Sequence, residues 1–316
     1  MQRKASRDVS TAKRDCHRHP IVGLWTAPGQ HLVPMEVVAR MNPDDGFGNA
    51  PILGHKHYEA PSAFTPENLL REARRQKGLP AGPVPAICVL DPDGDLVDHL
   101  WASDRLSPHH TWACYHTRLD TFVHQDMSYG IIGQVVGAPF AVLVAEELFA
   151  SGCRLLISIT SAGQILPLGQ PPYVILIDKA LRDEGTSYHY MPPTPFSHLD
   201  PTLREMVSTH WDHGQVPLHV GASWTTDAPF RETEAMIAYC RAAGILAVEM
   251  EAAALYALAQ ARQDQIICFA HVTNQMGQIE GDFEKGEASG SETALYVISQ
   301  TARSWRHRGS EPTKPI

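Results

Sequence analysis

The chain has 316 residues, of which 43% are hydrophobic, and it carries a formal net charge of −9. This length and composition fit one large α/β domain or two smaller ones with ordinary buried cores. The negative charge argues against a broad surface for nucleic acid or an acidic membrane, because either polyanion would repel it. No apolar run approaches the roughly 20 residues that span a bilayer, so we expect neither a nucleic acid nor a membrane as partner.

The first residues, MQRKASRDVSTAKRDCHRHP, are basic but lack the apolar stretch of a signal peptide. The six cysteines form no CxxC pair and lie at positions 16, 88, 114, 153, 240 and 268. Several of them stand in apolar surroundings, where buried free thiols are expected. We therefore predict a cytoplasmic protein with reduced cysteines.

The sequence has 17 histidines, and His55 with His57 and His109 with His110 suggest metal binding. No HExxH motif or acidic cluster completes a ligand set, so we expect loop or surface histidines and no metal. The sequence also lacks the GxxxxGK[ST], GxSxG and GxGxxG motifs. These absences argue against a P-loop, a nucleophile elbow and a dinucleotide fingerprint.

Residues 1–60 are rich in Pro, Gly, His and charge without a sustained period, so we expect an extended or poorly ordered segment before a domain at 61–316. The first clear helix is predicted from Thr65, which can cap it, to Gly78, which can end it. A buried strand is predicted at 84–90, followed by a turn.

Beyond this strand, predicted helices and strands alternate. Strands are predicted at 154–160, 173–181, 216–223 and 265–273, and helices at 138–152, 201–211, 231–244, 248–263 and 291–306. A small-residue turn is expected at 161–164. Three glycines are expected to turn a strand tightly into the helix at 138–152, namely Gly130, Gly133 and Gly137. The alternation predicts one three-layer α/β domain.

The stretch VEMEAAALYA, residues 248–257, places two carboxylates around a methionine at the start of an alanine-rich helix. Negative charge is favoured at a helix N-terminus, so both acids are expected to stay ionised. A carboxylate there can accept two hydrogen bonds from a vicinal diol such as that of ribose, and the methionine can contact the sugar face. An ordinary helix with two solvated acids is the alternative.

Five motifs follow one another along the chain: GAPFAVLVAEELFASG, LLISITSAGQI, DKALRDEGTSYHYMPP, GASWTTDAPFRET and VEMEAAALYA. In this order they resemble the nucleoside phosphorylase family, most of all its uridine phosphorylase-like branch, over about residues 84–305. The resemblance implies a single α/β domain with a mixed central sheet. It also implies no cofactor, inorganic phosphate as co-substrate, and a homo-oligomer (dimer to hexamer) whose active sites borrow residues from a neighbouring subunit.

The resemblance also suggests a place for DEGTSYHYMPP, residues 183–193. This segment is too polar for a core strand, and Pro192 and Pro193 prevent a helix from passing through it. In the family the segment lies near subunit contacts and the rim of the active site. Its polar groups are therefore expected to meet a partner chain, with an ordinary exposed loop as the alternative.

Site residues carry over by position. Glu249, Met250 and Glu251 match the ribose-binding triplet, with Glu251 as the catalytic residue that takes the sugar hydroxyls. The residues that match the base site are Ser161, Ala162, Gly163, Thr225, Thr226, Asp227, Phe230, Arg231, Asn274 and Gln275.

The base pocket departs from the family pattern at two places. Purine-directed relatives place an aspartate at the end of the last base-site strand, where this chain has Asn274 and Gln275. Uridine phosphorylases hold uracil with a Gln-x-Arg pair, where this chain has Phe230 and Arg231 in a different register. The identity of the base therefore stays open.

The phosphate site also departs from the family pattern. The family's GDPxR loop is replaced by DPDGD, residues 91–95, whose three carboxylates repel a dianion unless a metal or arginines offset them. Arg118 is the best remaining match to a phosphate arginine, with Arg105 as a possible helper and Gln134 near the position of the family's threonine.

We therefore expect a nucleoside phosphorylase that breaks the N-glycosidic bond through an oxocarbenium-like sugar, with a pyrimidine nucleoside such as uridine as a candidate substrate. Positioning and electrostatics would supply most of the rate enhancement. One alternative is a nucleoside hydrolase or a related ribosyl-cleaving enzyme that uses water. The other is a non-catalytic family member that binds nucleosides.

Overall fold

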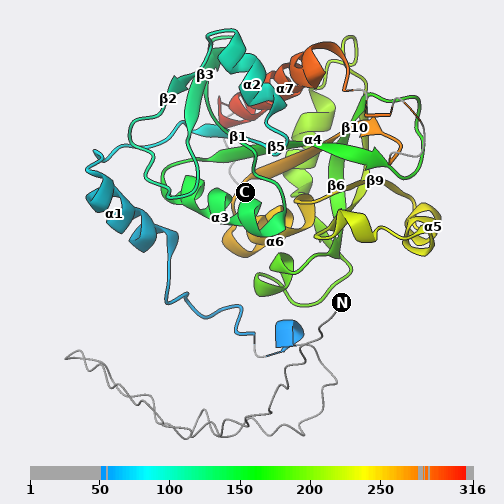
Figure 1. The fold of residues 1–316 in the computed structure, drawn as a ribbon, viewed down its shortest axis with the longest axis horizontal. Helices are drawn as coiled ribbons and strands as arrows, with labels where there is room; N and C mark the ends of the chain where they lie inside the picture. Colours follow the sequence, from blue (N-terminus) through cyan, green and yellow to red (C-terminus); the bar gives the residue numbers. More distant parts are fainter. Residues whose placement is uncertain (1–50, 55, 277–279, 281, 284, 311–316) are drawn as a thin grey trace, which may run out of the picture. The chain divides into compact units, whose positions relative to one another are not determined.

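The computed structural model describes residues 51–54, 56–276, 280, 282–283 and 285–310. Within these ranges the chain forms a mixed sheet of ten strands with helices on both faces (Figure 1). This arrangement confirms the predicted α/β class. His55 and Cys16, which entered the sequence analysis, lie outside the described residues, and the five other cysteines are free and buried, as predicted.

The strand order is β10-β6-β8-β9-β5-β1-β4-β3-β2, with β7 beside β6 and an additional pairing between β10 and β5. The strands are β1 (Ile87–Asp91), β2 (Ser107–Pro108), β3 (Asp120–His124), β4 (Met127–Gly133), β5 (Leu155–Gln164), β6 (Tyr173–Asp183), β7 (Phe196–His198), β8 (Leu218–Thr226), β9 (Ile245–Glu249) and β10 (Ile266–Asn274). Because β10 pairs with both β5 and β6, the strands β5, β9, β8, β6 and β10 close into a ring. The remaining strands extend from β5 as an open wing.

Strand β5 belongs to both parts of the sheet. One of its edges pairs with β10 up to Gly163, and Gly163 also pairs with β9, so β9 must lie on the opposite edge. That opposite edge pairs with β1 only as far as Ser158. Residues Ile159–Ala162 therefore have no strand neighbour on this edge, and we call this opening the β5 gap. A change of strand neighbours of this kind is where α/β sheets bind ligands.

Helices cover both faces of the sheet. Figure 1 shows α2 (Asp95–Ala102), α4 (Pro201–Thr209) and α7 (Ser291–Ser310) on one side, and α3 (Ala138–Ala150) and α6 (Ala252–Arg262) on the other. The other helices are α1 (Pro66–Lys77), α5 (Glu234–Ala242) and the short turns η2 (Pro51–Leu53), η3 (Thr186–His189), η4 (Pro229–Arg231) and η5 (Glu287–Gly290). None of the described helices is long and apolar enough to cross a membrane.

Local signals located α1 correctly. Thr65 accepts a hydrogen bond from the Asn68 N–H, and Gly78 ends the helix with φ of 63°. The turn predicted at 161–164 is wrong, because long-range pairing with β10 and β9 continues β5 through these residues. The helix predicted at 248–263 begins only at Ala252, because the residues before it form β9.

The polar segment 183–193 folds around one buried arginine. Arg182, only 4% exposed, stands near the end of β6. Its Nε donates to Ser187 Oγ at 2.8 Å, its Nη1 to Pro192 O at 2.7 Å and its Nη2 to Met191 O at 3.2 Å. A guanidinium has five N–H donors in a rigid fork, so one side chain can hold several loop carbonyls at once.

Polar side chains of the segment also bond to each other. The carboxylate of Glu184, which is buried, accepts the Ser187 N–H at 2.9 Å. The hydroxyl of Tyr188 donates to Arg182 O at 3.1 Å. Several polar groups of the segment are therefore bonded inside their own chain, while Glu184 Oε1 is buried without a partner among the described residues, and a role at a partner chain stays a prediction.

We predict that Arg182→Ala lowers the free energy of unfolding by about 2–4 kcal/mol, because it leaves several loop acceptors unpaired. Denaturant titration followed by circular dichroism measures this change. Arg204→Ala is the control, since Arg204 is 54% exposed and only 3.7 Å from Asp178, and such a surface pair contributes about 0–1 kcal/mol. Equal, small losses in the two variants would show that Arg182 does not organise the loop.

Candidate active site

Glu251 lies directly before α6 and is 2% exposed. Its Oε1 accepts the N–H of Gly137 at 2.7 Å, at the start of α3. Its Oε2 is buried and has no hydrogen-bond partner among the described residues. Buried carboxylate oxygens without donors are rare and costly, so this oxygen is suited to accept donors from a ligand.

Glu249, two residues earlier, is fully engaged within the chain. Its carboxylate accepts hydrogen bonds from the hydroxyls of Ser223, at 2.9 Å, and Thr225. It also accepts the backbone N–H groups of Glu251 and Ala252, each at 2.7 Å, and so caps the first turn of α6. Glu249 therefore positions Glu251, while Met250 between them is half-buried.

Burial, followed by the charge of Glu249, raises the pKa of Glu251 to about 8, against the hydrogen bond from the Gly137 N–H and the nearby Thr160 hydroxyl. Burial also raises the pKa of Glu249, but its four donors favour the ionised form. Of the two carboxyl groups, Glu251 is therefore the one that holds a proton more readily. The prediction that both acids stay ionised is wrong, because desolvation and mutual repulsion outweigh a helix-terminus effect of about 0.3–1 kcal/mol.

The acidic loop after β1 borders the β5 gap. Asp91 ends β1, and its Oδ2 accepts the Val97 N–H at 2.9 Å near the start of α2. Burial raises the pKa of Asp91 to about 7. Asp93 reaches the open edge of β5, where its Oδ2 accepts the Ser161 N–H at 2.8 Å. The loop thus fills part of the gap with a carboxylate.

A lysine offsets these acids, where a metal or arginines were considered. Lys285 donates a hydrogen bond to Asp95, and its Nζ lies 3.8 Å from Asp93 Oδ1. Burial alone would lower the pKa of Lys285, but the hydrogen bond to Asp95 and the charge of Asp93 raise it. The ammonium group is therefore charged and committed to these two carboxylates.

A small cavity lies beneath the same loop. Its volume is about 20 Å³, enough for one water molecule, and Asp91, Ser161 and His271 are among its lining residues. His271 Nε2 is buried and unpaired in the described part of the chain, and burial lowers the pKa of His271 to about 4. No group of three or more His, Cys, Asp or Glu side chains within the described ranges is arranged to hold a metal ion.

Part of the predicted base site comes together at the ends of β5 and β10. Asn274 Nδ2 donates to Ala162 O at 3.4 Å, and its Oδ1 accepts the Met276 N–H at 2.9 Å. A Cβ at Gly163 would stand 3.0 Å from side-chain atoms of Met276 and Val248, so a larger residue would have to displace them. Gln275 is tied through its N–H to the Asp282 carboxylate at 2.8 Å. These contacts fix the orientation of the Asn274 amide at the end of β10.

Other predicted base residues lie around η4. Thr226 is buried and accepts the Ala228 N–H at 3.2 Å, and Asp227 accepts the Gly185 N–H at 2.9 Å. Phe230 is fully exposed and Arg231 is exposed. The structure therefore does not bring these last two side chains to the β5 gap.

The three phosphate candidates are separated. Gln134 lies against Gly94 beside the acidic loop. Arg105 bonds to His124, which pairs with Met127 at the opposite end of β4, about 20 Å from the gap along that strand.

The third candidate, Arg118, lies over the Trp101 ring, 5.9 Å from its centroid. Trp101 stands in the last turn of α2, whereas Asp95 begins that helix. The sequence pointed to arginines, and the structure supplies Lys285, which no sequence motif marked.

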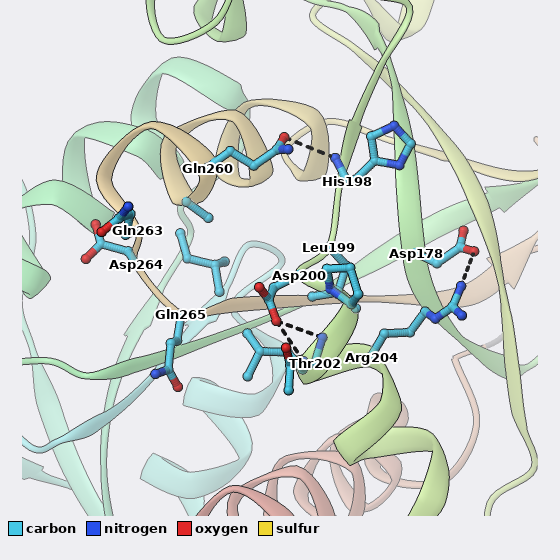
Figure 2. A pocket seen from close by; sticks show the side chains of 14 residues that line it. Asp178, His198, Leu199, Asp200, Thr202, Arg204, Gln260, Gln263, Asp264 and Gln265 are labelled. Atoms are coloured by element: carbon cyan, nitrogen blue, oxygen red, sulfur yellow. Dashed lines mark hydrogen bonds and ion pairs between the residues drawn. The ribbon is translucent and has the colours of Figure 1, made fainter. Parts of the chain in front are cut away.

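A cavity of about 740 Å³ lies at the far end of α6, roughly 15 Å along the helix from Glu251 (Figure 2). Several of its polar groups are bonded to each other, while Asp178 Oδ1 is buried without a partner among the described residues. Arg204 pairs with Asp178, Gln260 accepts the His198 N–H at 3.3 Å, and Asp200 caps α4. None of the residues that line this cavity is among those predicted for the site, whereas Glu251 and Ser161 lie at the β5 gap, which is therefore the better candidate.

The model of one protein family, described as the phosphorylase superfamily, matches residues 86–301. Among curated proteins, the chain is similar to the guanosine phosphorylase of Halorubrum lacusprofundi, with 29% identity over 129 residues. This match covers 40% of this chain and 52% of the relative, so the chain spans about half the length of that relative.

Solved structures share the fold. The uridine phosphorylase of Vibrio fischeri ES114 superposes with a TM-score of 0.59 and 21% identity, covering 70% of this chain and 93% of the other. A 5'-methylthioadenosine/S-adenosyl homocysteine nucleosidase from Campylobacter jejuni gives a TM-score of 0.57 and 18% identity, covering 69% and 99%. At these identities the likeness establishes the fold alone.

The raised pKa of Glu251 predicts a specific pH dependence of stability. The folded chain binds a proton that the unfolded chain releases at its ordinary pKa, so this group makes stability fall as pH rises from about 4.5 to about 8. Glu251→Gln removes this effect. The variant should gain stability relative to wild type by about 1 kcal/mol per pH unit over that window, measured by denaturant titration. A difference that does not change with pH would contradict this assignment.

Proposed function

Because this chain belongs to the phosphorylase superfamily, we propose that it cleaves the N-glycosidic bond of a nucleoside at the β5 gap. The observation that carries the proposal is the buried Oε2 of Glu251, which lacks a partner among the described residues. A ribose has two adjacent hydroxyls that can donate to such a carboxylate. These donors would favour the ionised form and lower the pKa of Glu251 when the substrate binds.

The charges around the gap suit a reaction that passes through a cationic sugar. Glu251, once ionised, and Asp93 are both acidic, and the charge of Asp93 reaches the carboxyl group of Glu251. Fixed negative groups stabilise positive charge that develops on the sugar as the bond to the base breaks. Holding the sugar between β5 and α6 also supplies orientation without a strong general base.

For the base, we propose a preference for pyrimidine nucleosides such as uridine. Asn274 has a neutral amide side chain, which lacks the acidic proton that an aspartic acid could give to a leaving purine. A pyrimidine base can leave as an anion held by hydrogen-bond donors. Uridine and guanosine together form the first pair of substrates to compare.

Glu251 variants test the function. We predict that Glu251→Gln lowers kcat/KM for nucleoside cleavage about ten- to hundred-fold, because it removes the charge from the hydrogen bonds to the diol. Glu251→Ala should reduce it further, since both oxygens are lost. Release of free base, followed by chromatography, measures both. Glu234→Gln, an exposed residue of α5, is the control and should match wild type, whereas wild-type rates in Glu251→Ala would remove Glu251 from the site.

We also propose that the chain forms a homo-oligomer. Exposed apolar side chains support this, with Phe64 being 72% exposed beside Leu143 in an open cavity of about 550 Å³ between α1, α3 and η3. Light scattering at micromolar concentration should give a multiple of 34.8 kDa. A monomer alone would contradict the assembly.

A further inference from the structure

We infer that the chain's own carboxylates occupy the anion-binding part of this site, so that the second substrate is water rather than phosphate. The inference rests on the proposed function, because it names the nucleophile of the same reaction. Three observations at the β5 gap carry it: where the donors point, how the charges balance and how open the gap is to solvent.

The donors that would hold a phosphate are already in use. The Ser161 N–H is on the edge of β5 that no strand covers, and it donates to Asp93 Oδ2 at 2.8 Å. The cation beside it, Lys285, is bonded to Asp95 and lies 3.8 Å from Asp93. A carboxylate presents the same kind of charged acceptor oxygens as a phosphate. Asp93 thus takes the contacts that an anionic co-substrate would need.

The charges oppose a second anion. Asp93 and Asp95 together carry two negative charges against the single positive charge of Lys285. The sum is −1 even when Asp91 and Glu251 are both protonated, and every further ionisation makes it more negative. A phosphate dianion would therefore be repelled, whereas a neutral water molecule would not.

Solvent can reach the gap. The Asp93 side chain is 31% exposed, so water can reach it. The arginines considered for phosphate, Arg105 and Arg118, contact His124 and Trp101 instead. In the part of the chain that the structure describes, the cation in contact with the acidic loop is Lys285.

The reaction balances with water alone. The water oxygen forms a bond to the anomeric carbon while the bond from that carbon to the base nitrogen breaks, and the electron pair of the broken bond leaves with the base. The water proton passes to the Asp93 carboxylate and on to solvent, and the base takes a proton from solvent. The products are a free sugar and a free base.

Cleavage with and without inorganic phosphate gives the first test, using the wild-type full chain and the nucleoside panel. We expect equal rates of base release and a free sugar as product. Release that requires phosphate and yields a sugar phosphate would overturn the inference and leave the proposed function standing. If no nucleoside is cleaved under either condition, the proposed function fails, and phosphate binding then decides the inference separately.

Binding of inorganic phosphate, measured by calorimetry, needs no turnover. Asp93→Ala frees the Ser161 N–H and Lys285, so it should bind phosphate about ten- to hundred-fold more tightly than wild type. Asp93→Asn keeps an oxygen that accepts the Ser161 N–H, so its affinity for phosphate should lie between those of wild type and Asp93→Ala. Asp98→Ala is the matched control, since it removes one exposed acid of α2 without freeing either donor.

The variants also give a clear contrary outcome. Circular dichroism checks that each variant is folded. If Asp93→Ala does not fold, the nearly isosteric Asp93→Asn still provides the comparison with wild type. The inference is wrong if wild type binds phosphate as tightly as Asp93→Ala and Asp93→Asn do. It is also wrong if Asp98→Ala improves phosphate binding as much as Asp93→Ala does, because charge alone would then explain the effect.

Discussion

The carboxylate of Glu249 holds together the elements on which the site depends. It accepts hydrogen bonds from Ser223 and Thr225 on β8 and from the two N–H groups that begin α6. A buried carboxylate with four donors is stable as an anion, and its charge is then felt by the neighbouring acid. Glu251 is fixed at the helix start by this arrangement, with one oxygen unpaired among the described residues and its pKa raised. One carboxylate is used for structure, and the next is the one that we propose for chemistry.

Arg182 and Lys285 are both at least partly buried, and the groups around each cation determine its role. Arg182 is surrounded by loop carbonyls and hydroxyls, so its planar fork organises the segment 183–193. Lys285 is surrounded by carboxylates, so its point charge offsets the acidic loop. Neither cation is placed to receive an anion from outside. The site therefore stays acidic because the N–H donors of both cations are already bonded to groups of the same chain.

Membership of the family does not by itself choose the nucleophile, because one fold can support several chemistries. In the proposed reaction, β5 and the helix α6 hold the sugar. In the reaction that we infer, the loop after β1 decides what can attack the sugar, since it borders the open edge of β5 at Ser161. Replacing an arginine-bearing loop with three aspartates changes the charge of that position while leaving the strands around it in place.

The sequence alone determined the features that depend on neighbours in the chain. Thr65 and Gly78 bounded α1 because caps act within one turn, and apolar runs placed most strands of the core. The five motifs indicated the family because they follow one another in the family's order, and the last of them contains Glu251. The described residues also contain α2, β3 and β9, which the sequence analysis did not predict, because α2 and β3 mix polar and apolar residues and β9 has only five residues.

Only the tertiary structure decided the features that depend on distant partners. Residues 161–164 are a strand because β9 and β10 pair with them, and no local pattern contains that information. Glu249 and Glu251 look alike in sequence, but hydroxyls of β8 bond one, while the N–H of Gly137, 114 residues away, meets the other. The bond between Lys285 and Asp95 spans 190 residues. Burial and charge at the site are sums over such contacts, so they exist only once the chain has folded.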